Sequence, residues 1–176
     1  IAHGDVLLLS RPLGTGVLFA AAMAGACSPE ALDTVLQQMA SSQHRLLDQL
    51  EPHRQAIHAC TDVTGFGLLG HLGEMVQSSS PLRITLQTDN IPAYPDAMDR
   101  LAQGYASSLA PANRKSWHWL DGAIQLDEAP SQALLELLVD PQTCGPLLLA
   151  CPETTAHSLM VEGPWIPIGN ATADHG

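Results

Sequence analysis

The segment HACTDVTGFGLLGHLGEM, residues 58–75, places Gly65, Gly67, Gly70 and Gly73 in a stretch that otherwise favours a helix. Each glycine inside a helix costs about 1 kcal/mol relative to alanine. A cluster of them therefore indicates that the backbone must come close to something, either another element of the fold or a ligand. A short apolar run at residues 56–60 precedes the cluster, so the segment predicts a strand, a turn and a closely packed helix.

Apolar runs and helical spacing alternate irregularly along the rest of the chain. Further strands are expected at residues 5–10, 81–88, 123–126, 147–151 and 165–168. Helices are expected at residues 17–26, 93–104, 130–138 and 154–161, while 107–119 is expected to be irregular. Because the strands are short and helices interrupt them, we expect an α+β architecture, with helices packed on a mixed, largely antiparallel sheet.

The longest predicted helix starts after Ser28, which is expected to cap it, with Pro29 as its first residue. Apolar residues keep helical spacing from there up to Pro52. We expect their stripe to be part of the core.

Composition narrows the class of protein. The chain has 176 residues, 45% of them apolar, which fits one domain with a substantial core. Its net charge of −11, with only seven Lys and Arg, argues against nucleic acid or an anionic membrane as a partner. The longest apolar run, residues 17–27, is too short to span a bilayer. The four cysteines form no CxxC pair and are expected to be buried, reduced thiols of a cytoplasmic protein.

The turn after residue 60 has two interpretations. Thr64 is expected to cap a helix that begins near Gly65, and the free N–H groups there suit a phosphate. Asp62 beside them is the kind of ligand that Mg²⁺ takes. Alternatively, the aspartate is only a helix cap and the glycines only allow the helix to pack on the sheet.

Four other features have a functional interpretation beside a simpler one. The turn RPLGTG, residues 11–16, is either a second anion-binding turn or a tight turn, which is favoured. The stretch DPQTCGP, residues 140–146, is expected to be an exposed β-turn with Pro141 at its second position. Cys144 lacks an evident base that would make it a nucleophile. His71 is expected to be a satisfied or surface histidine rather than a metal ligand.

Three strings, GDVLLLSRPLGTGVL, ACTDVTGFGLLGHLGEM and DPQTCGPLLLA, follow one another in this order. The combination resembles the C-terminal half of selenophosphate synthetase (selenide, water dikinase), from Gly4 to about Ala173. That family belongs to the aminoimidazole ribonucleotide synthetase, or PurM-like, superfamily. The resemblance implies a PurM C-terminal domain-like fold and one domain over residues 1–176. It also implies that the ATP-binding N-terminal half of a longer enzyme is absent, in agreement with a chain that begins with Ile1.

The resemblance also implies a function. The family makes selenophosphate, AMP and phosphate from selenide, ATP and water, with Mg²⁺. By position, Asp62 is then a metal ligand, and Thr64, Gly65 and Gly67 are cofactor-binding residues. Gly70 and Gly73 would be packing glycines. No catalytic residue is assigned to this half, and the absent half would bind most of the ATP, so we expect the isolated chain to be inactive and the parent chain to be a homodimer.

Two departures from the family pattern keep other functions open. The usual DPQTSGG is DPQTCGP here, and Pro146 removes an N–H from that turn. The family's Gly-Gly-Thr before an Asn is missing, so only Asn113 aligns. One alternative is another ATP-using member of the superfamily, of the aminoimidazole ribonucleotide synthetase, thiamine monophosphate kinase or hydrogenase maturation type. The other is a non-catalytic binding module.

Overall fold

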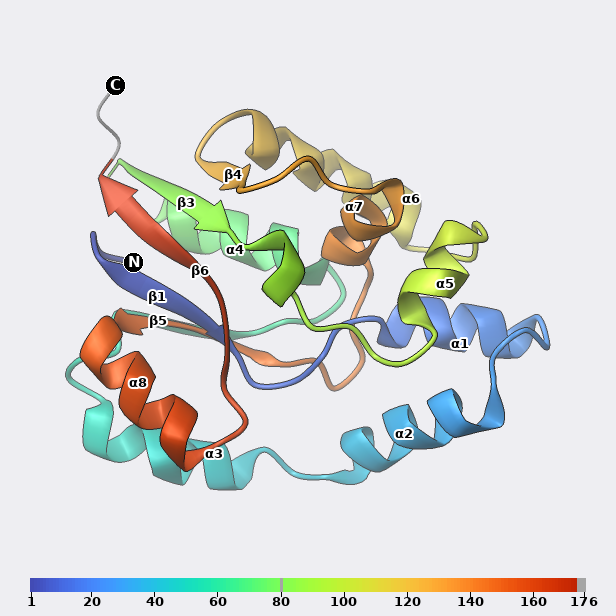
Figure 1. Cartoon of the computed structure of the whole chain (residues 1–176), viewed down its shortest axis with the longest axis horizontal. Helices are drawn as coiled ribbons and strands as arrows, with labels where there is room; N and C mark the ends of the chain where they lie inside the picture. The colour runs from blue at the N-terminus through green and yellow to red at the C-terminus, as the bar shows by residue number, and fades with distance from the viewer. Residues whose placement is uncertain (80, 174–176) are drawn as a thin grey trace.

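The computed structural model describes residues 1–79 and 81–173, in which six strands form one sheet in the order β2-β5-β1-β6-β3-β4 (Figure 1). All neighbouring strands pair antiparallel except β3 and β4, which are parallel. The strands are β1 (Asp5–Leu9), β2 (Ala59–Asp62), β3 (Leu82–Leu86), β4 (Ile124–Leu126), β5 (Leu147–Pro152) and β6 (Ile166–Ala173). The expected mixed, largely antiparallel sheet is therefore confirmed.

Strand β1 lies inside the sheet because its side chains are apolar on both faces. Leu7 and Leu9 belong to the larger hydrophobic cluster, whereas Leu8 belongs to the smaller one on the opposite face. All three leucines are fully buried. A strand with this pattern requires helices on both sides of the sheet.

Helices connect most of the strands (Figure 1). The α-helices are α1 (Thr15–Met23), α2 (Pro29–Ala40), α3 (His44–Leu50), α4 (Gly67–Gln77), α5 (Ala97–Ala102), α6 (Ala110–Asn113), α7 (Gln132–Val139) and α8 (Glu153–Glu162). Short 3-10 helices are η1 (Glu51–His53), η2 (Thr88–Asn90) and η3 (Arg114–Asp121). The segment expected to be irregular after residue 107 thus contains α6 and η3.

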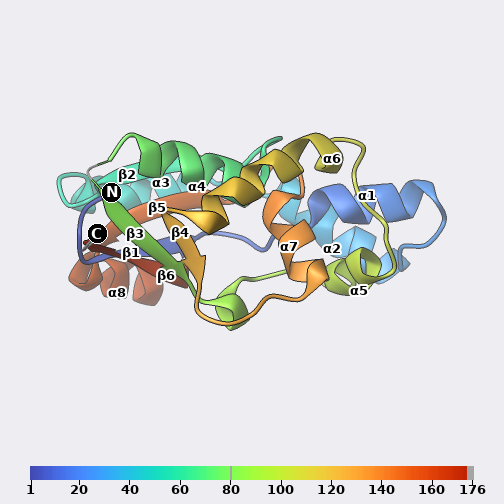
Figure 2. The same ribbon diagram turned by 90° about the horizontal axis from the view of Figure 1, so that it is seen from above.

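The sheet separates two apolar layers. Figure 2 shows α8 on one side of the sheet and α4 on the other, with α1, α2 and α5 beyond one end of the strands. The smaller cluster joins α3 and α8 to the sheet through Leu46, Leu50, Leu159 and Trp165. The larger cluster joins α1, α4, α5 and α7 to the other face. The expected α+β fold with helices packed on the sheet is therefore confirmed, and the structure shows that helices lie on both of its faces.

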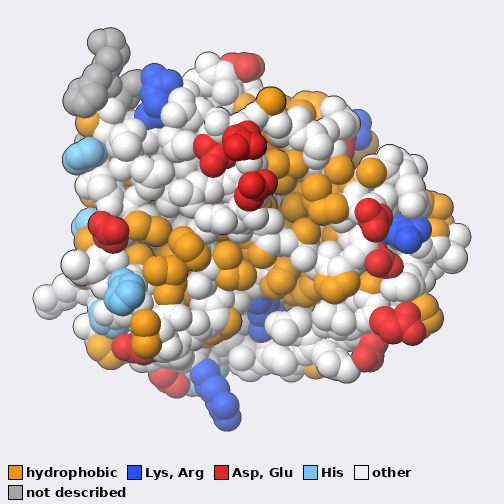
Figure 3. All heavy atoms as spheres, in the orientation of Figure 1, with side chains coloured by type: hydrophobic (Ala, Val, Ile, Leu, Met, Phe, Trp, Pro, Cys, Tyr) orange, Lys and Arg blue, Asp and Glu red, His pale blue; other side chains and the backbone are white. Residues whose placement is uncertain are grey.

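The surface is rich in acidic groups. On the face drawn in Figure 3, Asp and Glu side chains are spread widely, whereas Lys and Arg are sparse. Apolar side chains also reach this face in two areas, one over the sheet and one toward the end where α5 and α7 lie. Among the described residues, no helix is long and apolar enough to cross a membrane.

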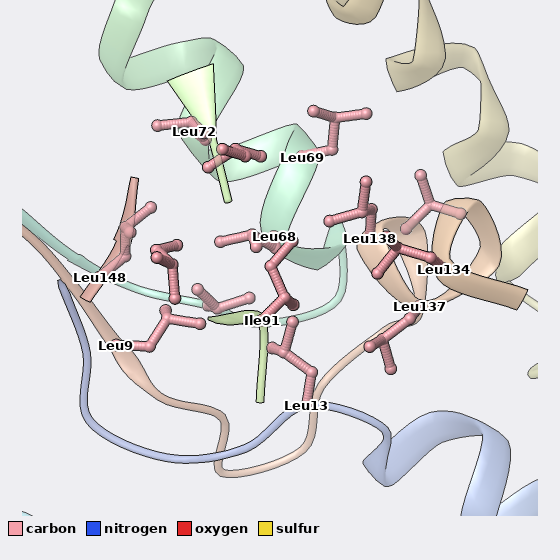
Figure 4. Packing of buried hydrophobic residues seen from close by; sticks show 14 of the residues in the cluster. Leu9, Leu13, Leu68, Leu69, Leu72, Ile91, Leu134, Leu137, Leu138 and Leu148 are labelled. Carbon is pink, nitrogen blue, oxygen red and sulfur yellow. The ribbon is translucent and has the colours of Figure 1, made fainter. Parts of the chain in front are cut away.

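Helix α4 rests on the larger core through one row of leucines. Figure 4 shows Leu68 and Leu72 facing the sheet, with Leu9 of β1 and Leu148 of β5 below them and Leu138 of α7 beside Leu68. Burial of one such leucine contributes about 2 kcal/mol. The start of α4, and with it the preceding loop, is therefore held against the centre of the molecule.

The expected single helix from Pro29 to Pro52 is wrong, because it is divided into α2 and α3. Ser28 does cap α2, its Oγ accepting a hydrogen bond from the Ala31 N–H at 3.2 Å. The division occurs at Ser41, which has extended backbone and whose carbonyl accepts a hydrogen bond from the Arg11 guanidinium. This contact with a residue far away in sequence outweighs the helical pattern.

The apolar stripe of that predicted helix is only partly in the core. Val35 is fully buried, but Leu36 and Leu47 are about half exposed (47% and 51%). The break between α2 and α3 interrupts the helical spacing on which the predicted stripe depends.

The prediction of buried thiols is also wrong for most of the cysteines. Cys151 of β5 is buried, whereas Cys60 and Cys144 are exposed and Cys27 is intermediate. Cys60 belongs to the edge strand β2, and Cys144 to the turn before β5. All four are free thiols.

Candidate functional site

Strand β2 brings Asp62 to the surface. This strand pairs only with β5 and forms one edge of the sheet, and Asp62 is its last residue, opposite Leu147. Its side chain is exposed and makes no hydrogen bond or ion pair with any other described residue. An exposed carboxylate without a protein partner is free to bind a hard cation such as Mg²⁺.

The loop that follows is tied to the segment 139–146. The Val63 N–H donates to the Pro146 carbonyl at 2.8 Å, and the Thr64 carbonyl accepts from the Gln142 N–H at 2.9 Å. A side chain at Gly145 would collide with the Val63 carbonyl. Two parts of the chain that are about 80 residues apart in the sequence thus form one unit.

Thr64 does not cap the helix as predicted. Helix α4 begins at Gly67, two residues later than expected, and its N-terminus has no side-chain cap. The Thr64 hydroxyl lies 3.1 Å from His71 Nε2 instead, and the same nitrogen accepts a hydrogen bond from the Thr64 N–H at 3.1 Å. The Thr64 carbonyl accepts from the Gly67 N–H, which closes the turn.

His71 is the satisfied histidine that the sequence predicted. It is nearly buried, and its Nε2 must be unprotonated in order to accept from the Thr64 N–H. Its other nitrogen, Nδ1, lies 3.9 Å from the Glu74 carboxylate. His71 therefore holds the loop between β2 and α4 through Thr64.

The glycines of the segment have different roles. Gly65 has open space where a side chain would be, whereas a Cβ on Gly67 would lie 2.7 Å from the Val139 carbonyl carbon. Gly67 also has a φ of +73°, which L-residues rarely adopt. Close packing against α7 thus explains Gly67, and only Gly65 has open space beside it.

The predicted packing role of Gly70 and Gly73 agrees with the geometry. A Cβ on Gly70 would lie 2.8 Å from the Phe66 Cβ, and one on Gly73 would collide with the Trp119 indole. Trp119 itself belongs to η3, which crosses α4 at this point. The two glycines allow that crossing.

The turn at residues 11–16 is occupied by the protein itself. Gln142 Oε1 accepts from the Gly14 N–H at 3.1 Å, and Asp140 Oδ2 accepts from the Gly16 N–H at 3.0 Å. The N-terminus of α1 is therefore capped from within, which agrees with the tight turn and leaves these two N–H groups unavailable to an outside anion.

The expectation of an exposed turn at residues 140–146 holds only for Thr143 and Cys144 and is wrong for the residues on either side of them, which are buried. Asp140 is 1% exposed and Gln142 is 5% exposed. The Thr143 N–H donates to the Thr15 hydroxyl at 2.8 Å, and the Arg11 guanidinium donates to the Cys144 carbonyl at 3.2 Å. The segment is a structural link between α1 and the glycine-rich loop.

Burial perturbs the carboxyl group in this link. Desolvation raises the pKa of Asp140 to about 7, against the lowering effect of hydrogen bonds from Gln142 and Gly16. Its second oxygen, Oδ1, is buried and has no hydrogen-bond partner among the described residues. The sequence pattern of a Pro-containing turn contains no signal for this burial.

Asn113 is a second residue whose position the sequence did not predict. It is 5% exposed, and its Nδ2 donates to the Gly65 carbonyl at 2.7 Å and to the Val139 carbonyl at 3.0 Å. The only sequence signal was its alignment with an Asn of the resembling family. The structure brings it to the same loop as Asp62, Thr64 and Gly65.

Two cavities in the surface do not include the predicted site residues Asp62, Thr64, Gly65 and Gly67 in their linings. A cavity of about 620 Å³ lies beside α8 and β6 and is lined by residues such as Val6, His157 and Asn170. A smaller one of about 380 Å³ beside β2 and α4 is lined by Cys60, His71 and their neighbours. Within the described residues, no group of three or more His, Cys, Asp or Glu side chains is placed to hold a metal. Asp62 is exposed, and it is the one carboxylate among residues 62–67.

The six-stranded, largely antiparallel sheet with helices packed on both faces defines an α+β domain, in which Asp62 ends one edge strand. Residues 2–176 match the family described as AIR synthase related protein, C-terminal domain, and the chain belongs to this family. A selenide, water dikinase from Desulfitobacterium hafniense is 34% identical over 161 residues. The match covers 89% of this chain and 44% of that protein, so the chain spans less than half the length of this relative.

Solved structures confirm the fold. The hydrogenase maturation protein HypE in complex with ATP superposes with a TM-score of 0.58 at 20% identity, covering 98% of this chain and 43% of that one. Thiamine monophosphate kinase from Aquifex aeolicus gives a TM-score of 0.56 at 13% identity, covering 98% and 48%. At these identities the likeness establishes the fold alone.

Proposed function

We propose that this chain is the C-terminal domain of an ATP-dependent selenophosphate synthetase, with residues 1–176 as a single domain of a longer cytoplasmic enzyme. The parent enzyme converts selenide, ATP and water into selenophosphate, AMP and phosphate. The observation that carries the proposal is the 34% identity to a selenide, water dikinase over 89% of the chain, with an unpartnered carboxylate at Asp62.

In this proposal Asp62 supplies one oxygen ligand to Mg²⁺, and the turn formed by Thr64, Gly65 and Gly67 lies beside the phosphates. Bound Mg²⁺ neutralises charge on phosphoryl groups, which is the main requirement of phosphoryl transfer. Since one carboxylate does not complete a magnesium site, the remaining ligands come from the N-terminal half of the parent chain. That half also binds most of the ATP.

The charge of the chain supports a shared site. A net charge of −11 with seven Lys and Arg leaves this domain unable to offset a nucleotide triphosphate by its own cations. The open position of Asp62 at the sheet edge supports the same conclusion, because a second domain can approach it there. We therefore expect the isolated chain to fold but to be inactive, and the parent enzyme to be a homodimer.

Phosphorus NMR of the natural polypeptide that contains this chain tests the proposed reaction. The enzyme is incubated with Mg-ATP, with and without selenide. Selenide-dependent formation of selenophosphate together with AMP is the expected result. Formation of ADP would favour another kinase of this fold, and no turnover of ATP would favour a non-catalytic binding module.

The role of Asp62 is tested in the same assay. Asp62→Asn keeps the size of the side chain and removes its charge, so we expect the rate to fall by about 100-fold or more, because a magnesium ligand is weakened. Asp89→Asn, a change at another exposed aspartate, is the matched control and should leave the rate unchanged. Equal rates for both variants would remove Asp62 from the site.

A further inference from the structure

Hydrogen bonds determine which way the peptide groups of the loop between β2 and α4 face. The Thr64 carbonyl accepts from the N–H groups of Gln142 and Gly67, and the Gly65 carbonyl accepts from Asn113 Nδ2. Gln142 and Asn113 are both buried, so these two consecutive carbonyl groups point into the domain. The Thr64 carbonyl belongs to the same peptide group as the Gly65 N–H, and the Gly65 carbonyl belongs to the same peptide group as the Phe66 N–H.

A trans peptide places its N–H opposite its carbonyl group. The described chain contains no cis peptide bond, so the N–H groups of Gly65 and Phe66 point away from Gln142 and Asn113. Neither N–H donates a hydrogen bond to another described residue. The open space at Gly65 lies beside them. The two carbonyl contacts thus decide that the loop presents two free N–H groups to the outside.

We propose that Asn113 is a positioning residue that sets the orientation of the Gly65–Phe66 peptide, and so of the Phe66 N–H, in the loop that follows Asp62. This inference rests on the proposed function for its use, since the N–H would face phosphate oxygen atoms held near Mg²⁺. Asn113 itself touches neither a phosphate nor the metal. It acts only through the peptide that it holds.

The second hydrogen bond of Asn113 makes this hold rigid. The same Nδ2 donates to the Val139 carbonyl at the C-terminal end of α7. Gly67 also packs against the backbone of Val139, at a distance that excludes a side chain. The Asn113 amide therefore links the loop to α7, because it donates to one carbonyl group in each of them, Gly65 and Val139.

Hydrogen exchange of the wild-type chain, followed residue by residue by NMR, gives the first test. The N–H groups of Thr64 and Gly67, which donate within the domain, should exchange slowly. Those of Gly65 and Phe66 should exchange at least about tenfold faster because they have no acceptor. Equal protection at all four positions would overturn the inference without any variant.

The variant Asn113→Asp gives the second test. It has the same shape, but a carboxylate oxygen would face the carbonyl groups of Gly65 and Val139 without a proton to donate. We expect the protection of Thr64 and Gly67 to fall about tenfold more than that of β1 and β5, and the Phe66 amide signal to shift. Gln125→Glu is the matched control, because its amide bonds only to Thr85 between β3 and β4.

A purely structural role of Asn113 would lower protection by the same factor throughout the domain, and that result would overturn the inference. If Asn113→Asp does not fold, Asn113→Ala is measured in its place, since it removes the donor without adding a charge. In the natural polypeptide, Asn113→Asp should reduce the rate at saturating Mg-ATP while Gln125→Glu does not. If Asn113→Asp changes the amide protection of the loop but not the rate, the result would contradict the proposed function. The inference that Asn113 positions the loop would still stand.

Discussion

Asp140 shows how a residue can be decisive for the fold while its local sequence predicts an exposed turn. Its carboxylate lies at the N-terminus of α1, where Oδ2 accepts from the Gly16 N–H. Favourable contact with a helix N-terminus normally lowers a carboxyl pKa, but burial is the larger effect here and raises the pKa of Asp140 to about 7. The group is thus balanced between its two charge states near neutral pH.

This balance predicts a dependence of stability on pH. The folded pKa of about 7 lies above the value of 3.8 for the unfolded chain. The contribution of Asp140 is therefore fully present below about pH 3.8 and is lost as the pH rises through 7. We expect Asp140→Asn, which resembles the protonated form, to flatten the fall in Tm between pH 5 and pH 8. Asp48→Asn, at an exposed position of α3, should keep the wild-type profile. A profile for Asp140→Asn that matches the wild type would contradict the prediction.

Two glycines of the same loop should respond differently to alanine. Gly67→Ala forces a side chain into a φ of +73° and against the Val139 backbone, so we expect a loss of about 2–4 kcal/mol of stability. That loss corresponds to a decrease in Tm of about 4–16 °C for a domain of this size. Gly65→Ala meets no atom within 4 Å and should change Tm by less than about 2 °C. Thermal unfolding followed by circular dichroism measures both, and similar losses for the two variants would refute the difference in packing.

At the scale of elements, local sequence patterns predicted where most helices lie but not the residues at which they end. The cap at Ser28 and the following Pro29 predicted the start of α2 correctly. Its end at Ala40 depends on the bond between Arg11 and the Ser41 carbonyl, which joins residues 30 positions apart. Helix propensity amounts to a few tenths of a kcal/mol per residue, so one partly buried hydrogen bond from a charged group is large enough to compete with it.

The two serine caps allow a direct measurement of local stabilisation. Ser28 Oγ accepts from the Ala31 N–H at 3.2 Å, and Ser131 Oγ accepts from the Leu134 N–H at 3.1 Å. We expect Ser28→Ala and Ser131→Ala each to lower the free energy of unfolding by about 1 kcal/mol. Urea unfolding curves give this value. Ser158→Ala, in the middle of α8, removes a hydroxyl that caps no helix and should cost less than about 0.5 kcal/mol.

At the scale of the whole molecule, charge is the dominant feature. The chain has 18 acidic and seven basic residues. Surface repulsion among the acidic groups opposes folding, and dissolved salt screens it with a Debye length of about 10 Å at 0.1 M. The same excess of negative charge argues against nucleic acid as a partner, and a phosphate bound to this domain would need cations to offset its charge.

Salt should therefore stabilise the domain. Raising potassium chloride from about 20 mM to 200 mM at pH 7.5 should increase Tm by a few degrees, because the repulsion is screened. Choline chloride should have the same effect, which distinguishes screening from binding of potassium. A Tm that is constant or falls with both salts would show that surface repulsion contributes little.

The amino-acid sequence by itself determined the α+β class, the order of most elements and the membership of a family, because alternating apolar periods and the string DVTGFGLLGH are local properties of the chain. It also singled out Asp62 and the glycines as a candidate site. Only the tertiary structure decided which glycine is needed for packing and which has open space, since that depends on how close α7 comes to the loop. It likewise decided that Asp140 and Gln142 are buried and that Asn113 bonds to the Gly65 carbonyl. Contacts between residues far apart in sequence fix hydrogen-bond partners and desolvation, and no local pattern encodes either of them.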